Sequence, residues 1–104
     1  MDIDKIVLAG DSAGGHMTLS VTIMCLLRGI KPPCGLLALY PVCSVSLNTF
    51  FPSSLMFADD EILSAAAITV VTACTTRKGG NAEKDPVMSP LVAPEVLLRM
   101  MPPT

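Results

Sequence analysis

The sequence predicts an α/β fold in which a buried strand turns sharply into a buried helix. Three observations support this prediction. Residues 5–9, KIVLA, form a short run that is apolar after its first residue and includes β-branched side chains. Residues 10–15 have the sequence GDSAGG, and residues 17–27 are nearly all apolar. Strands and helices that are apolar on every side are typical of a sheet covered by helices on both faces. The order strand, glycine-rich turn and helix therefore indicates an α/β sandwich.

The glycine-rich turn has the spacing G-x-S-x-G, with Ser12 between Gly10 and Gly14. Between a strand and a helix, this spacing predicts a nucleophile elbow, in which the serine hydroxyl is raised above the end of the strand. We expect Ser12 to adopt a strained backbone with positive φ, at a cost of roughly 1–3 kcal/mol. We also expect side chains at Gly10 and Gly14 to collide, and Gly15 to let the helix lie close to the strand. The alternative is a glycine-rich turn with an incidental serine, which the flanking strand and helix make less favourable.

Ser12 is thus the candidate nucleophile, and Ala13 the candidate oxyanion-hole residue. The N–H of Ala13 lies at the start of the predicted helix, where it can donate to an oxyanion. The helix dipole favours negative charge at the same place.

A second strand is expected after the first helix. Gly29 and the pair Pro32 and Pro33 end the helix, and the apolar residues 35–40 form a strand that Pro41 ends. Together with the first strand they make a β-α-β unit, whose crossover is right-handed by strong preference.

The rest of the chain predicts less regular structure. Residues 43–58 suggest a loop, whose apolar side chains line an acyl pocket or cover the sheet: Phe50, Phe51, Leu55, Met56 and Phe57. The acidic residues 59–61 indicate the start of a helix to about Cys74, although residues 68–72 favour a strand by composition. Residues 75–85 form a polar connection, and one or two helical turns follow over residues 95–101.

The length and composition predict a partial domain over residues 1–104, truncated at both ends. A complete fold of this kind needs several more strands and helices than 104 residues can supply. The chain is 51% hydrophobic and only 15% charged, which is more apolar surface than so small a body can bury. We therefore expect the remainder of the domain to cover its apolar faces.

Composition also excludes several classes of partner. A net charge of −2 with scattered basic residues argues against nucleic-acid binding. Neither a signal peptide nor a transmembrane segment is evident, so a cytoplasmic location is expected. The four cysteines lack C-x-x-C spacing and have one histidine to join them, so we expect no metal site but free, buried thiols. Two disulfides are the alternative in an oxidising compartment.

Four segments carry a resemblance to a known family: LAGDSAGG at residues 8–15, ALYP at 38–41, DPVMSPLVAP at 85–94 and MPP at 101–103. Together they resemble the hormone-sensitive-lipase-like family of α/β hydrolases, and most of all the catalytic domain of the eukaryotic lipases. The resemblance implies a cytosolic, cofactor-free hydrolase of acylglycerols or related lipid esters. It also implies that Ser12 forms the acyl-enzyme and that Ala13 N–H contributes to the oxyanion hole.

The resemblance implies further parts that these residues do not contain. The family's H-G-G oxyanion loop is expected before residue 1, and its triad acid and histidine after Thr104. The family's long regulatory insertion is reduced to residues 77–84. We therefore expect the isolated chain to be inactive. The alternative is a non-catalytic binding or interaction module, as the plant gibberellin receptors of the same group illustrate.

Other polar side chains are weaker candidates for catalysis. His16, on the first turns of the helix, is expected to pack and not to serve as the base. Asp11 and Asp85 are expected to make structural hydrogen bonds, and the acidic residues 59–61 to begin a helix. We expect four methionines to fill space in the hydrophobic core: Met24, Met88, Met100 and Met101.

Overall fold

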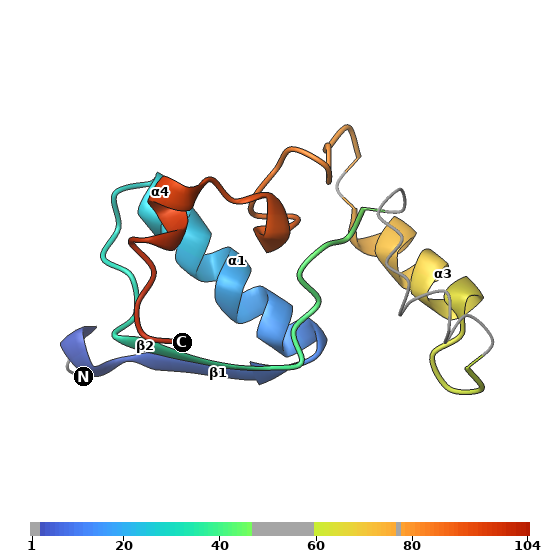
Figure 1. Ribbon diagram of the computed structural model, residues 1–104, viewed down its shortest axis with the longest axis horizontal. Coiled ribbons are helices and arrows are strands. Elements are labelled where there is room, and N and C mark those ends of the chain that lie inside the picture. The colour runs from blue at the N-terminus through green and yellow to red at the C-terminus, as the bar shows by residue number, and fades with distance from the viewer. Residues whose placement is uncertain (1–2, 47–59, 77) are drawn as a thin grey trace.

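The computed structural model describes residues 3–46, 60–76 and 78–104 (Figure 1). Predictions for residues 47–59, including the apolar side chains of the proposed acyl pocket, lie outside the described residues. The elements in chain order are η1 (Ile3–Lys5), β1 (Val7–Asp11), α1 (Ala13–Leu27), β2 (Gly35–Leu39), α3 (Ala65–Thr75), η2 (Pro90–Val92) and α4 (Glu95–Leu98).

The two strands pair in parallel, as the sequence predicted. Val7 lies opposite Gly35 and Asp11 opposite Leu39, and α1 connects the strands across one face of the sheet (Figure 1). The first strand begins two residues later than expected, because Lys5 belongs to the 3-10 turn η1 and pairing continues through Asp11. The β-α-β unit therefore places the turn after β1 at the carboxyl edge of the sheet.

The two faces of the sheet differ in exposure. On the face toward α1, Leu36 is buried. On the opposite face, Val7, Leu37 and Leu39 are 58%, 53% and 47% exposed. Strands that are apolar on both faces belong in a sheet covered on both sides. The exposed face is thus a surface that a second layer would bury.

The helix α1 ends as the sequence predicted. Gly29 has φ of 65°, a left-handed conformation that glycine adopts without steric cost. Its N–H donates to the carbonyl of Leu26 at 3.2 Å, and Ile30 N–H donates to that of Cys25 at 2.8 Å. This pair of bonds is a Schellman motif, which satisfies carbonyls that the last turn leaves free.

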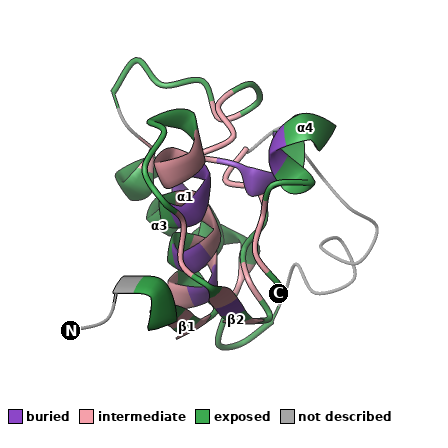
Figure 2. Ribbon diagram, turned by 90° about the vertical axis from the view of Figure 1, so that its left-hand side faces the viewer, coloured by how far each residue is buried: buried purple, intermediate pink, exposed green. Residues whose placement is uncertain are grey.

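A small core joins α1 to the C-terminal segment. Ile23 of α1 is 1% exposed and packs with Ala93 and Leu97, with Met101 against the cluster. In Figure 2 the colour for buried residues appears on α1 and on the segment that leads through α4. Met101 thus fills the core as expected, whereas Met100 is 57% exposed and does not.

Residues 85–91 tie the segment after β2 to the rest of the structure. Ser89 is fully buried, and its hydroxyl accepts a hydrogen bond from Val45 N–H at 3.1 Å. Leu91 N–H donates to the carbonyl of Cys43 at 2.9 Å. The Asp85 carboxylate accepts from Val87 N–H at 2.9 Å, as expected for a structural side chain.

The segment around residues 60–75 is helical, but its helix begins later than predicted. Ser64 is the N-cap of α3, and its hydroxyl accepts from Ala67 N–H at 3.3 Å. The carboxylate of Asp60 accepts from Ile62 N–H at 2.9 Å and Leu63 N–H at 2.6 Å, so it organises the turn before the helix. These two bonds lower the pKa of Asp60. Asp60 and Glu61 therefore precede the first helical turn.

The cysteines are free, but they are less buried than predicted. Cys25 is half-buried, whereas Cys34, Cys43 and Cys74 are exposed.

Close packing between α1 and the strands depends on two of the elbow glycines. A Cβ at Gly10 would lie 2.4 Å from the carbonyl carbon of Gly14. A Cβ on Gly15 would lie 3.1 Å from both the Leu39 carbonyl oxygen and Pro41 Cβ. At Gly14, in contrast, the nearest atom would be Asp11 Oδ1 at 3.9 Å, so the predicted collision there is wrong. The backbone of Gly14, and not its missing side chain, sets the limit at Gly10.

We predict opposite effects for alanine at these two positions. Gly10→Ala forces α1 away from β1 and is expected to lower the free energy of unfolding by about 1–3 kcal/mol. Gly14→Ala fits and restricts the unfolded chain, so it is expected to raise it by about 0.5–1 kcal/mol. Urea unfolding followed by circular dichroism measures both. Equal stability of the two variants would contradict the packing argument.

We also predict that the turn before α3 weakens in acid. Because the two N–H bonds favour the ionised carboxylate of Asp60, their stabilisation is complete above the usual aspartate range. It is lost as the pH falls through the lowered pKa of the folded state. An NMR titration of the Asp60 carboxyl carbon should give a midpoint below the ordinary aspartate value of about 3.9. A midpoint at or above that value would refute the prediction, and Asp60→Asn provides the pH-independent control.

Candidate functional site

Ser12 lies in the turn that joins β1 to α1, with φ of 48° and ψ of −113°. The positive φ predicted for the elbow is confirmed. The Ser12 N–H donates to the Leu39 carbonyl at 3.0 Å, and the Ser12 carbonyl accepts from His16 N–H at 3.0 Å. These bonds hold a residue whose backbone conformation costs roughly 1–3 kcal/mol.

Within the residues that the structure describes, the Ser12 hydroxyl does not cap the helix that follows it. Ser12 is the N-cap residue of α1, a position at which serine usually accepts a hydrogen bond from the helix backbone. Here the side chain makes no capping bond, and the residue is exposed. The turn therefore presents a free hydroxyl at the carboxyl edge of the parallel sheet, the edge at which ligands bind in open α/β sheets.

Ala13 is the first residue of α1 and is exposed beside Ser12. The first four N–H groups of a helix lack acceptors within the helix, and the dipole gives this end a partial positive charge. An oxyanion at the Ser12 hydroxyl would thus lie beside uncapped backbone donors. The assignment of Ala13 N–H to an oxyanion hole stays a prediction.

Tyr40 is a second strained residue at the same edge, and the sequence analysis did not identify it. It follows the end of β2 as Ser12 follows β1, and its φ is 36°. The hydroxyl of Tyr40 lies 3.5 Å from Asp11 Oδ2, so it links the ends of the two strands weakly. Its place before Pro41 predicts the end of a strand but gives no sign of positive φ.

His16 is bonded away from the Ser12 hydroxyl. Its Nδ1 lies 2.7 Å from the carbonyl oxygen of Val42, and its Nε2 lies 3.2 Å from the Ser20 hydroxyl. A general base must hydrogen-bond to the nucleophile. With both ring nitrogens engaged elsewhere, His16 has the structural place that the sequence predicted.

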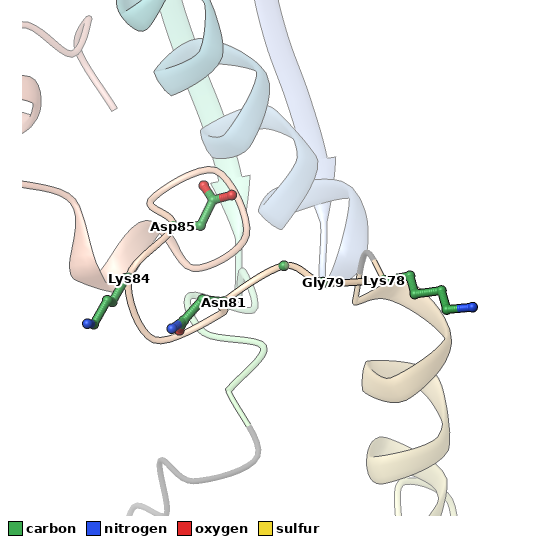
Figure 3. A pocket seen from close by; sticks show the side chains of 6 residues that line it. Lys78, Gly79, Asn81, Lys84 and Asp85 are labelled. Carbon is green, nitrogen blue, oxygen red and sulfur yellow. The ribbon is translucent and has the colours of Figure 1, made fainter.

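A separate, open cavity of ≈ 470 Å³ lies in the connection after α3, lined by Lys78, Gly79, Gly80, Asn81, Lys84 and Asp85 (Figure 3). Gly79 has φ of 80° there. Figure 3 shows the Lys78 side chain directed away from Asn81 and Asp85. None of the lining residues belongs to the turn around Ser12, so this cavity is distinct from the elbow.

Within residues 3–46, 60–76 and 78–104, no three His, Cys, Asp or Glu side chains come together as a metal site. Across the same ranges, none of the helices has both the length and the apolar character that a membrane span requires.

Comparisons with known proteins agree with this geometry. A family model described as the alpha/beta hydrolase fold matches residues 1–104. Hormone-sensitive lipase of Mus musculus is 32% identical over 82 residues, which are 79% of this chain and 10% of that protein. The Homo sapiens lipase is 30% identical over 82 residues, or 7% of its length. The chain thus spans about a tenth of these relatives.

Solved structures show the same fold. Carboxyl esterase 2 from Tuber melanosporum superimposes with a TM-score of 0.86 at 22% identity, over 98% of this chain and 33% of its own. An ester-hydrolase from the metagenome of Lake Arreo, complexed with a bipyridine phosphonate derivative, gives a TM-score of 0.67 at 28% identity, over 82% of this chain and 26% of its own. The predicted partial α/β-hydrolase fold is confirmed.

Three observations lead to one conclusion: the sharp turn from β1 to α1 beside a parallel strand pair, the match of the family model over residues 1–104, and the identity with the lipases. The chain belongs to the α/β-hydrolase-fold family, as a hormone-sensitive-lipase-like part of that fold.

Proposed function

We propose that this chain is the nucleophile-bearing segment of a serine lipase or carboxylesterase that hydrolyses acylglycerols or related lipid esters. The observation that carries the proposal is the strained, exposed Ser12, whose hydroxyl is left free at the N-terminus of α1. A backbone strain of this kind persists only where surrounding structure holds it, and it is common at active sites.

In the proposed reaction, Ser12 Oγ attacks the carbonyl carbon of the ester while a histidine accepts the hydroxyl proton. The carbonyl oxygen becomes an oxyanion beside Ala13 N–H, where the helix dipole stabilises it. The tetrahedral intermediate expels the alcohol, which takes the proton from the histidine. Water then attacks the acyl-enzyme in the same way and releases the acid. No cofactor takes part.

The accepting histidine must come from outside these 104 residues. His16 is the sole histidine of the sequence, and its ring nitrogens are bonded to Val42 and Ser20. Without a base, Ser12 stays a neutral alcohol of low nucleophilicity. We therefore expect the isolated chain to be inactive, and the proposal assigns catalysis to a protein that contains the remaining triad and the other oxyanion donors.

The exposed apolar surfaces support a segment of a larger domain over an independent binding module. Met17 and Leu27 of α1 are 64% and 55% exposed, and the outer face of the sheet is also bare. The family's sandwich buries such surfaces beneath further helices. The lipid-ester substrate and the cytoplasmic location that the family resemblance implies belong to this proposal.

The proposal predicts that Ser12 is essential in a complete hydrolase domain. The test replaces the matching third of the Tuber melanosporum carboxyl esterase with this chain, since that structure matches 98% of the chain. Hydrolysis of p-nitrophenyl butyrate by the chimera is expected, and Ser12→Ala should lower kcat by at least about 10³-fold.

The matched control is Ser64→Ala, which removes a hydroxyl from the N-cap of α3, outside the elbow. This variant should keep kcat within about threefold, as expected for a serine away from the reacting atoms. Retained hydrolysis in Ser12→Ala, or a properly folded chimera that never hydrolyses the ester, would count against the proposal.

A further inference from the structure

We propose that His16 is a positioning residue for Ser12, acting through its Nδ1–H bond to the segment that follows β2. This inference rests on the proposed function, because it concerns the placement of the nucleophile. It assigns His16 a role beyond filling space on the helix.

The hydrogen-bond partners determine how the His16 ring is held. The Val42 carbonyl can only accept, so the contact of 2.7 Å requires a proton on Nδ1. In the neutral ring Nε2 is then an acceptor, and the Ser20 hydroxyl at 3.2 Å donates to it. Bonds at both nitrogens restrict the ring to one orientation.

These contacts complete a closed set of links around the elbow. The Ser12 N–H donates to Leu39, the chain continues from Leu39 to Val42, Val42 accepts from the His16 ring, and His16 N–H donates to Ser12. Gly15 packs against the same segment, because a Cβ placed on it would lie 3.1 Å from both the Leu39 carbonyl oxygen and Pro41 Cβ. The strained turn at Ser12 is thereby held from both ends.

The segment that accepts the His16 hydrogen bond is itself held by further hydrogen bonds. Val45 N–H donates to the buried Ser89 hydroxyl at 3.1 Å, and Cys43 accepts from Leu91 N–H at 2.9 Å. A bond to this segment therefore fixes the first turn of α1 against a supported surface. A side chain at position 16 that packed without donating a hydrogen bond would not make this connection.

The geometry distinguishes a donor role from simple packing. In His16→Asn, the side-chain N–H₂ lies near the former place of Nδ1 and can donate to Val42. In His16→Leu, the volume is kept but the donor is lost. The proposal therefore predicts that Asn preserves the elbow and Leu does not, whereas packing alone predicts the reverse order.

The first experiment measures hydrogen exchange of the Ser12 amide in the 104-residue chain by NMR. In His16→Leu this amide should exchange at least about tenfold faster. Opening of the turn then no longer requires a bond between residue 16 and Val42 to break, so its free-energy cost is lower. In His16→Asn it should stay within about threefold of the parent chain. The Ile30 amide, bonded to Cys25 at the far end of α1, serves as the internal control. Should His16→Leu fail to fold, His16→Gln, whose longer side chain moves the donor away from the Nδ1 position, takes its place.

The second experiment measures kcat and KM in the esterase chimera. His16→Leu should lower kcat by about tenfold with KM unchanged, as expected when the nucleophile is misplaced but substrate still binds, and His16→Asn should restore it. An inactive parent chimera would refute the proposed function, while the exchange data would still decide the role of His16. Unchanged Ser12 exchange in His16→Leu, or no rescue by Asn, would overturn the inference.

Discussion

The close approach of α1 to the carboxyl ends of both strands is the constraint on which the rest of the structure depends. At Gly10 the helix backbone comes so near that a single added carbon would lie 2.4 Å from it. Gly15 brings the same helix against the end of β2. With strand and helix this close, the residues between them have room for only a sharp turn. The strained φ of Ser12 is therefore a consequence of packing, which the glycines make possible.

The same constraint builds the site from backbone more than from side chains. The uncapped start of α1 supplies N–H donors and positive potential, and the turn supplies a free hydroxyl. Hydrogen bonds from Ser12 to Leu39 and from His16 to Ser12 belong equally to the fold and to the site. In this part of the hydrolase fold, a change that loosens the packing of the helix would also displace the Ser12 hydroxyl.

The small core leaves much of the chain's apolar surface exposed. Its buried hydrophobic residues are few, and the most central, Ile23, joins α1 to the C-terminal segment. Apolar side chains on the outer face of the sheet, such as Leu37, are left exposed. A short chain buries a small fraction of its surface, so an apolar composition of 51% is suited to the interior of a larger domain. The match to about a third of an esterase chain agrees with this conclusion.

The sequence by itself determined the order of elements, the elbow around Ser12 and the need for glycine at position 10, because these follow from local hydrophobic patterns and turn geometry. The sequence predicted the start of α3 too early, because both Ser64 and the acidic residues before it are typical of a helix start. Tertiary structure alone decided the positive φ of Tyr40 and the partner of His16. The latter bond joins residues 26 apart in the chain, and such contacts depend on how the crossover brings strand ends together.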